Sequence, residues 1–386
     1  MHNENILISG AGIAGPALAH WLRRYGFRPT IVERAPALRE GGQAVDFRGT
    51  AHLTVLRRMG ILDEVRRRQT ERTKMVAIDA AGRPRATLPA EFASGEVEIL
   101  RGDLADLLHD LTRDDTEYVF GDWITSLTET ADGVRVTFDK APPRTFDLVV
   151  GADGLHSGVR ALAFGPEERF RRFLGYYIAG FGVPERLQTP GEVRMYSEPG
   201  RMISPGLAVF ASAELNYDRH DTAQQKKLVA DACHGMGWRA PEILEAMWAA
   251  PDFYFDPIAQ IHIDRFTTGR IALLGDAGYG ATLGGLGAGQ ALVTAYVLAG
   301  ELAAAGGDHR AAFARYEHQI KDYARGCQKI SGNAGPFMAP ATPAKIRQRN
   351  LMYRLLSLPA MAKPMNKITT KAANAIRLAD YSRFLR

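Results

Sequence analysis

Residues 5–34 read NILISGAGIAGPALAHWLRRYGFRPTIVER, and this stretch predicts the fold of the chain around it. A short apolar strand is followed by a glycine-rich turn, a helix and a second strand that ends at Glu33. Gly10 permits the tight turn, Gly12 lets a pyrophosphate approach the backbone, and Gly15 lets the helix pack closely on the strand. The helix N-terminus attracts phosphate, and Glu33 can accept the hydroxyls of an adenosine ribose. The stretch therefore predicts a bound dinucleotide, either FAD or NAD(P).

The composition of the 386-residue chain is that of a globular protein, with 46% hydrophobic and 24% charged residues. Its net charge of +5 comes from the tail, because residues 340–386 hold ten Lys or Arg and one acid. The first 339 residues carry 38 basic against 42 acidic side chains, so charge gives no reason to expect nucleic-acid binding by the main body.

The cysteines and histidines show no metal-binding pattern. The two cysteines, Cys233 and Cys327, are far apart and outside any CxxC pair, which suits a reducing cytoplasm. His220, His234 and His262 lack metal-ligand spacing, so we expect no metal. The chain enters a strand at once, without a signal peptide, and no apolar run approaches the roughly 18 residues that span a bilayer. These features predict a cytoplasmic protein.

Two further strand ends carry glycine and aspartate. An apolar strand over 145–150 leads into Gly151-Ala152-Asp153-Gly154, and another over 270–274 leads into Gly275-Asp276 and a glycine-rich turn. Ligands of open α/β sheets bind at the carboxyl ends of strands. Three such ends suit one long ligand that touches the chain repeatedly.

Between these motifs the sequence changes to strand-rich, aromatic stretches, which predicts an inserted second domain. We expect an α/β fold with a mostly antiparallel β-sheet insertion and C-terminal helices. The predicted boundaries are 1–73, 96–168 and 267–335 for a discontinuous dinucleotide-binding domain, 74–95 and 169–266 for the inserted substrate domain, and 336–386 for a basic helical segment. The main expected helices are 50–59, 61–68, 103–113, 222–236, 241–250, 309–329, 342–358 and 360–379.

With these motifs in order, the chain resembles the FAD-dependent aromatic hydroxylases over most of residues 4–330. These single-component flavoprotein monooxygenases include p-hydroxybenzoate hydroxylase and the tetracycline-inactivating monooxygenases. The matching segments are the first glycine motif with Glu33-Arg34, GADGLHSGVR at 151–160 and LLGDAGYG at 273–280. The resemblance implies a Rossmann-like, three-layer ββα FAD-binding domain. The cofactor-binding residues that it implies are Gly10, Gly12, Ile13, Ala14, Gly15, Glu33, Arg34, Asp46, Arg101, Asp153, Gly154, Gly275, Asp276, Gly285, Leu286, Gly287 and Ala288.

The resemblance also implies the chemistry. NADPH or NADH reduces FAD, reduced FAD takes up O2, and the flavin C4a-hydroperoxide passes one oxygen to a hydrophobic aromatic or polyketide-like molecule, as in polyketide tailoring or antibiotic modification. Because the flavin carries this chemistry, no catalytic side chain is expected. Arg39 can contact the phosphate of the nicotinamide cofactor, as an arginine of this loop does in relatives, or it can be a solvated surface charge.

One segment departs from the family pattern. The loop over 279–289 has no proline, and Tyr279 replaces a frequent histidine, which predicts a looser loop beside the flavin ring. Two alternatives therefore stay open at this point. One is an FAD-dependent dehydrogenase or reductase that inserts no oxygen, and the other is a flavin-binding relative without turnover.

Several other assignments have two interpretations. Asp153 can contact the cofactor, cap the helix after it, or do both. The tail helices can pack across the second domain or rest on an anionic membrane, and packing is the simpler interpretation. We expect a monomer or homodimer. The candidate substrate contacts, each of which can equally be a core residue, are Tyr177, Phe181, Met195, Arg201, Phe210 and Tyr254.

Overall fold

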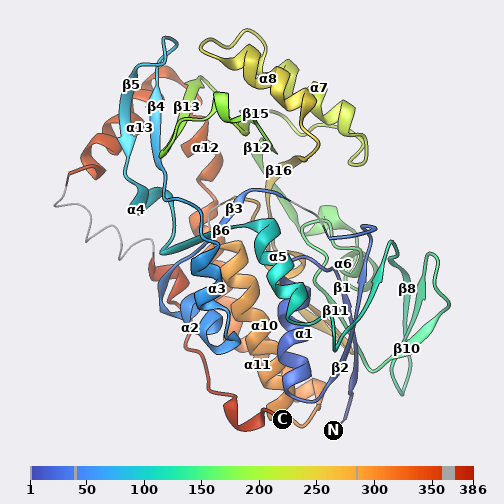
Figure 1. The fold of residues 1–386 in the computed structure, drawn as a ribbon. Coiled ribbons are helices and arrows are strands. Elements are labelled where there is room, and N and C mark those ends of the chain that lie inside the picture. The colour runs from blue at the N-terminus through green and yellow to red at the C-terminus, as the bar shows by residue number, and fades with distance from the viewer. Residues whose placement is uncertain (1, 39–40, 284–285, 359–369) are drawn as a thin grey trace.

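The computed structural model describes residues 2–38, 41–283, 286–358 and 370–386, and Figure 1 shows their arrangement. The larger part is built on a six-stranded sheet with β1 at its centre. β1 pairs in parallel with β2 and β11, and β11 pairs in parallel with β18. In order across the sheet, the strands are β17 (Thr267–Thr268), β18 (Ile271–Leu273), β11 (Leu148–Gly151), β1 (Asn5–Ser9), β2 (Arg28–Glu33) and β7 (Glu117–Phe120).

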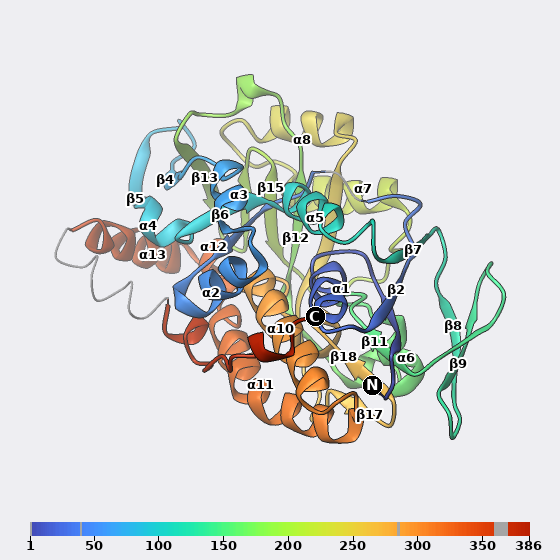
Figure 2. The same cartoon turned by 60° about the horizontal axis from the view of Figure 1, so that its bottom comes forward.

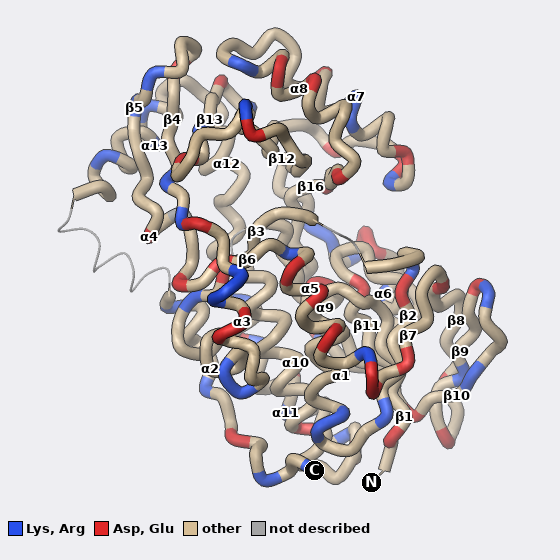
Figure 3. The backbone as a smooth tube through the Cα atoms, viewed as in Figure 1, with Lys and Arg blue, Asp and Glu red and all other residues tan. Residues whose placement is uncertain are grey.

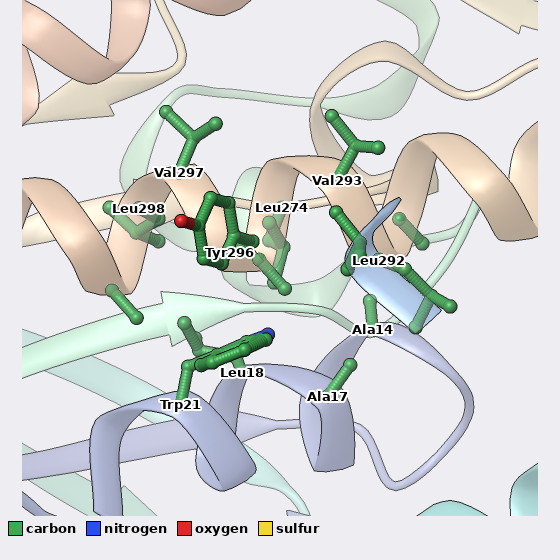
Figure 4. Packing of buried hydrophobic residues seen from close by; sticks show 14 of the residues in the cluster. Ala14, Ala17, Leu18, Trp21, Leu274, Leu292, Val293, Tyr296, Val297 and Leu298 are labelled. Carbon is green, nitrogen blue, oxygen red and sulfur yellow. The ribbon is translucent and has the colours of Figure 1, made fainter. Parts of the chain in front are cut away.

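Helices cover this sheet because its central strands are apolar on both sides. Ile6, Leu7 and Ile8 of β1 are fully buried, as expected for a parallel sheet between two layers. α1 (Ala14–Arg24) packs against α10 (Gly287–Ala304), as Figure 4 shows, and small residues such as Ala17 let the two helices approach closely. Leu18 is fully buried there, so replacing it by alanine would cost about 2–5 kcal/mol. The other helices of this part are α2 (Gly49–Met59), α3 (Leu62–Arg67), α5 (Arg101–Asp110), α6 (Gly158–Ala163), α9 (Asp276–Tyr279) and α11 (His309–Ser331).

A seven-stranded sheet forms the second part. It joins the segments 74–88 and 171–261, and all of its pairings are antiparallel except that of β13 with β4. In order across the sheet, its strands are β16 (Phe253–Ile261), β12 (Arg171–Phe181), β15 (Leu207–Ala211), β14 (Arg201–Ser204), β13 (Glu192–Glu198), β4 (Lys74–Ile78) and β5 (Pro84–Leu88).

The two faces of the seven-stranded sheet are covered by different helices. α7 (Thr222–Cys233) and α8 (Ala240–Ala249) pack on the outer face, farthest from the six-stranded sheet, as Figures 1 and 2 show. α12 (Ala334–Met338) and α13 (Pro343–Leu356) pack on the opposite face, which we call the inner face. Because side chains alternate along a strand, neighbouring residues belong to different faces. The helices predicted over 222–236 and 241–250 are confirmed.

The strand predicted over 145–150 is wrong, because two strands in different sheets replace it. β10 (Arg144–Phe146) belongs to a three-stranded sheet with β8 (Ile124–Glu129) and β9 (Val134–Phe138), whereas β11 belongs to the six-stranded sheet. Asp147 separates them, because its carboxylate accepts the N–H of Asn5 at 2.8 Å and its own N–H donates to the Asn5 carbonyl at 2.9 Å.

The remaining elements are short. β3 (Ala44–Phe47) pairs with β6 (Val97–Leu100), and α4 (Ala90–Ala93) lies between β5 and β6 in the chain. The 3-10 turns are η1 (Glu167–Arg169), η2 (Glu185–Leu187) and η4 (Ser382–Phe384). The first predicted tail helix is confirmed as α13. Of the second, predicted over 360–379, residues 360–369 lie outside the described residues, and the described part is α-helical only over 370–373. In the described part of the chain, no helix has the length and apolarity needed to cross a membrane.

Candidate active site

The three predicted glycine motifs meet at one edge of the six-stranded sheet. Ser9 lies opposite Gly151, and Gly151 lies opposite Leu273, so β1, β11 and β18 end side by side. A Cβ placed on Gly10 would lie 2.5 Å from the Ala152 carbonyl oxygen. A Cβ on Gly275 would likewise lie 3.3 Å from the Cβ of Ala14. A side chain at Gly10 would therefore clash with the backbone, and one at Gly275 would be crowded by α1.

The first glycine loop has the shape that a pyrophosphate needs. Gly10 has a φ of 109°, which favours glycine. A Cβ on Gly15 would lie 2.0 Å from the Gly10 carbonyl oxygen, so only a glycine at this position lets the helix pack this closely on the loop. A Cβ on Gly12, by contrast, meets nothing closer than an Arg101 nitrogen at 3.5 Å. Gly12 therefore lines an open cradle, next to Ile13 and Ala14 at the start of α1.

Glu33 closes the other side of this loop. Its carboxylate accepts the N–H groups of Ala11 and Ala35, both at 2.8 Å, which fixes it at the end of β2. This position suits an adenosine ribose. The side chain of Arg34 is engaged elsewhere, because its guanidinium lies 4.5 Å from the ring centre of Trp123. We therefore leave the Arg34 side chain out of the candidate site.

Asp276, the first residue of α9, points into a recess. Its side chain is exposed and accepts no hydrogen bond from the described residues. Protein nevertheless surrounds the carboxyl group, and the resulting desolvation raises its pKa to about 6. The charge of Arg101 opposes this rise, and the charge of Asp256 adds to it. We infer from these two observations that Asp276 lines a recess in the surface. A Cβ on Gly287 would lie 4.0 Å from Asp276 Oδ1, so the recess adjoins the N-terminus of α10.

Asp153 stands in different surroundings, because its hydrogen bonds are made within the protein. It accepts the Ser157 hydroxyl at 2.5 Å, the Val159 N–H at 3.1 Å and the Ser9 hydroxyl at 3.3 Å. Burial raises the pKa of the Asp153 carboxyl. These contacts hold the start of α6 and join the ends of β1 and β11, so the structural role considered for Asp153 is present. Gly154, with a φ of 80°, turns the chain beside it.

Arg101 spans the distance between the first and third motifs. Its backbone N–H donates to the Gln43 carbonyl at 3.1 Å, and α5 begins at this residue. Its guanidinium lies near Gly12, and its charge lowers the pKa of Asp276 against the effect of burial. This position lets Arg101 reach a pyrophosphate and the ribose side of a dinucleotide together.

Asp46 retains an unused acceptor. It is 8% exposed, and its Oδ2 accepts two hydrogen bonds from Arg48, at 2.7 and 2.5 Å. Its Oδ1 is buried without a hydrogen-bond partner among the described residues, and burial raises its pKa. A buried acceptor of this kind is costly unless a ligand supplies a donor. Arg39 and Gly285, two other predicted contacts, lie outside the described residues.

The first part of the proline-less loop is anchored, so the prediction of a looser loop is wrong for residues 279–282. The Tyr279 hydroxyl accepts the Gly275 N–H at 3.0 Å and lies 3.0 Å from the Tyr316 hydroxyl. The Gly280 carbonyl accepts the Ile261 N–H at 3.0 Å, and the Thr282 N–H donates to the Ala259 carbonyl at 3.1 Å. The loop thus pairs with β16. Hydrogen bonds of Tyr279 restrict this part of the loop in the way that a proline would.

The N-terminus of α10 follows this loop. No side chain caps the helix at Leu286, and its first turn contains no acidic residue. The N–H groups of Leu286, Gly287 and Ala288 are therefore available to an acceptor, and the positive end of the helix dipole favours negative charge there.

Four of the predicted substrate contacts are contradicted by their placement. Tyr177, Phe181 and Phe210 lie on the outer face, in the core beneath α7 and α8. The Tyr177 hydroxyl is already used, because it accepts the Leu215 N–H at 2.8 Å. Arg201 lies on β14, an interior strand rather than an edge, and it binds Glu198 and donates to the His234 carbonyl at 2.8 Å. These residues stabilise the sheet and its outer helices.

The other two predicted substrate contacts, Met195 and Tyr254, lie on the inner face of the seven-stranded sheet. Met195 is fully buried in the inner-face core. Tyr254 is 40% exposed, and its hydroxyl donates to Asp256 at 3.1 Å. Burial raises the pKa of Tyr254 well above its usual range, with Asp256 and Asp276 adding to the rise and Arg101 opposing it. Tyr254 therefore joins the candidate site.

One polar cluster beside this site was not predicted from the sequence. His156, two residues after Gly154, lies 2.9 Å from Asp256 through Nε2 and 3.0 Å from Glu167 through Nδ1. Burial opposes the charged imidazole, but the two carboxylates outweigh it and raise the pKa of His156. His156 itself lies within the second motif, 151–160, so the sequence shows one member of the cluster. Its partners lie 11 and 100 residues away, and no local pattern joins them.

These residues fit FAD. The open cradle at Gly12 suits a pyrophosphate, and the carboxylates of Glu33 and Asp276 suit the hydroxyls of the adenosine and the flavin side chain. The unpaired Asp46 Oδ1 offers one further acceptor.

Comparison with known proteins agrees with this fit. A family model described as FAD binding domain matches residues 3–197. The chain is 41% identical to a flavin-dependent monooxygenase from an unknown prokaryotic organism, over 98% of this chain and 100% of that protein. It is 37% identical to a flavin-dependent monooxygenase of Legionella longbeachae, over 85% of this chain and 88% of that one. The crystal structure of the tetracycline destructase Tet(55) matches with a TM-score of 0.83 and 37% identity, covering 98% and 99% of the two chains.

These relatives give no support to the alternatives of a dehydrogenase or a flavin protein without turnover. They agree instead with the motifs and the recess found in the structure. The chain belongs to the flavin-dependent monooxygenase family, oxidoreductases that carry FAD.

Proposed function

We propose that this monooxygenase uses NAD(P)H and O2 to oxygenate a hydrophobic aromatic or polyketide-like small molecule. The observation that carries the proposal is the meeting of three glycine-bearing strand ends at one edge of the six-stranded sheet, with the Arg101 guanidinium near Gly12 and the Asp276 side chain exposed at the third strand end. The similarity to the tetracycline destructase Tet(55) supports the class of substrate.

We propose that residues at three strand ends bind FAD. The first glycine loop and α1 would bind the pyrophosphate, with Glu33 on the adenosine side and Arg101 reaching across from α5. Asp276 would accept hydrogen bonds from the flavin side chain. The chemistry that FAD supplies when bound is acceptance of hydride from NAD(P)H and activation of O2.

The start of α10 has a separate task. Its N–H groups at Leu286, Gly287 and Ala288 would stabilise negative charge on a flavin ring bound next to them. The segment 279–282, which precedes this helix in the chain, is itself anchored by hydrogen bonds to β16 and to Gly275. Fixed donors stabilise developing charge without the cost of reorganising.

The inner face of the seven-stranded sheet would bind the substrate. Its core carries partly exposed apolar residues, and one of them, Leu283, comes from the loop that follows Asp276. Apolar walls exclude water and bind an aromatic molecule through its faces rather than through charge. The candidate contacts on this face are Met75, Phe92, Leu207, Leu283 and Phe337.

We further propose a cytoplasmic location and a monomer or homodimer. Cys233 and Cys327 are both free thiols and both buried, which suits a reducing compartment. Arg39 remains the proposed contact for the phosphate of NAD(P)H.

The test begins with the absorbance spectrum of the purified protein, which we expect to show bound FAD. NADH and NADPH oxidation is then measured with phenols, tetracyclines and other polyketides, and products made under ¹⁸O2 are analysed by mass spectrometry. We expect a product that gains one labelled oxygen atom. A true turnover product without label would replace the proposal by a dehydrogenase, and protein that cannot be loaded with FAD would overturn it altogether.

A further inference from the structure

Helix α13 is apolar on two opposite faces, although the fold uses one of them. Tyr353 and Leu356 are 0% and 8% exposed and pack on the inner face of the seven-stranded sheet. Leu351, Leu355 and Leu358 are 57%, 51% and 53% exposed. A helix needs a single apolar stripe to dock on a protein core, so the second stripe is not explained by packing among the residues that the structure describes.

The exposed leucines form a continuous stripe rather than scattered contacts. Leu351 and Leu355 are four residues apart in α13 and share a face of the helix. Leu358 follows in the turn after the helix end, where its N–H donates to the Leu355 carbonyl at 3.1 Å. Met352, which is 38% exposed, widens the stripe at its edge. Single exposed apolar side chains are common on protein surfaces, but a contiguous set marks an interaction site.

Positive charge borders this stripe. α13 contains Lys345, Arg347, Arg349 and Arg354 but no acidic residue, and Figure 3 shows it without red segments. Arg347 and Arg354 are exposed and lie seven residues apart, so both extend from one side of the leucine stripe. The Arg354 guanidinium donates to the Arg85 carbonyl at 2.9 and 2.8 Å, which holds it in place beside β5.

We propose that this face of α13 lies flat on an anionic lipid surface, with Leu351, Leu355 and Leu358 entering the acyl boundary and Arg347 and Arg354 contacting lipid phosphates. An apolar stripe bordered by basic side chains is the pattern of an interfacial helix, and long basic side chains reach the headgroups while their stems stay in apolar surroundings. A second copy of the chain fits less well, because two basic faces would repel each other. The helix rests on the membrane and does not cross it.

The test is co-sedimentation of full-length, FAD-loaded protein with vesicles of phosphatidylcholine alone or mixed with phosphatidylglycerol. We expect binding to the mixed vesicles, weakened by added salt because screening shortens the reach of the charges. The variant Leu351→Ser/Leu355→Ser/Leu358→Ser should lower the partition coefficient by about a hundredfold, since it removes three apolar side chains from the lipid. Arg347→Gln should lower binding to the mixed vesicles by about fivefold.

A matched control replaces three other exposed leucines. Leu111, Leu162 and Leu385 are 39%, 44% and 39% exposed, and their triple serine variant should bind as the wild type does. Thermal unfolding of both triple variants checks that each remains folded. Absence of binding to the mixed vesicles, or equal binding by the α13 variant, would overturn the proposal. So would a dimeric wild type that the α13 variant converts to a monomer, because the stripe would then be a subunit interface.

Discussion

The strand ends at Asp153 and Asp276 lie next to each other in the six-stranded sheet, and both follow a buried strand and a glycine. Their carboxylates nevertheless have opposite surroundings. Asp153 accepts three hydrogen bonds from its own chain, two of them within the turn that starts α6. Asp276 accepts none from the described residues and is exposed to the recess.

An aspartate that follows a buried strand and a glycine therefore has two different roles in this protein. A carboxylate whose hydrogen bonds are satisfied by the protein stabilises the motif, whereas an unsatisfied and desolvated one is stabilised only when a ligand supplies donors. We therefore propose that Asp276 contributes mainly to FAD affinity and that Asp153 contributes mainly to the stability of the fold.

The largest expected effect follows from removing the open carboxylate. Asp276→Ala should weaken FAD binding by more than a hundredfold, or about 3 kcal/mol, because hydrogen bonds to a charged acceptor are lost. Titration of apo-protein with FAD, followed by flavin fluorescence, measures the change. The apo-protein should be at least as stable as the wild type, because the variant also loses the cost of the desolvated carboxylate. Unchanged affinity would remove Asp276 from the site.

Asp153→Ala should show the reverse pattern. The loss of its three internal hydrogen bonds should lower the free energy of unfolding of the apo-protein by about 2 kcal/mol. Urea denaturation gives this value, and the change in FAD affinity should stay below about tenfold. If the variant instead retained full stability and failed to bind FAD, the division between the two aspartates would be wrong.

Much of this arrangement could be predicted from the sequence. The fingerprint from Gly10 to Glu33 is local, since its turn, helix and acid are close in the chain and constrained by sterics. The second and third motifs follow the same rule, so their convergence at one sheet edge needed only the topology of parallel strands. The comparison with known proteins confirms FAD as the cofactor that these motifs imply.

The inserted domain could not be predicted at the same level. Strand patterns located β12 and β15, but the sequence does not say which face of a buried sheet points to a ligand. From the sequence, Tyr177 and Phe210 were therefore as good candidates for substrate contact as Met195, although they lie on the opposite face of the sheet. The loop after Asp276 shows a related limit. The stiffness that proline would give arises here from Tyr279 and Tyr316, which are 37 residues apart.

The second motif is also tied to the seven-stranded sheet through His156, and this contact should depend on pH. The pKa of His156 is raised above 6.5, so its stabilisation is complete below pH 6.5 and is lost as the pH rises through the folded value. The pKa of Glu167 is lowered from 4.5 despite burial, so its contribution is present above pH 4.5 and is lost as the pH falls through the folded value. His156→Gln should therefore lower stability most near pH 6, by about 1.5 kcal/mol.

Urea denaturation of wild type and His156→Gln between pH 5 and pH 9 measures this difference. We expect the two proteins to become more alike toward pH 9, because neutral histidine no longer pairs with the carboxylates. A difference that stayed constant over this range would mean that the imidazole contributes packing alone.

The smallest effect concerns Asp276 without its ligand. Its carboxyl pKa rises from 3.8 to about 6 on folding, so the folded apo-protein binds protons more tightly than the unfolded chain. Its stability should therefore fall as the pH rises from about 4 through 6, with the full cost present above that range. Asp276→Asn removes the cost, and the variant should be more stable than the wild type at pH 8. The gain is about 1 kcal/mol, less than the full shift implies, because solvent in the recess screens the charge.

Apo wild type and Asp276→Asn are compared by urea denaturation at pH 5 and pH 8, with and without saturating FAD. The gain should be larger at pH 8 than at pH 5, and it should reverse with FAD, because the ligand stabilises the wild type more strongly. A group that destabilises the empty protein and stabilises the loaded one acts on the ligand rather than on the fold. Equal stabilities at both pH values would show that the recess hydrates the carboxylate fully, and the contrast with Asp153 would then rest on hydrogen bonding alone.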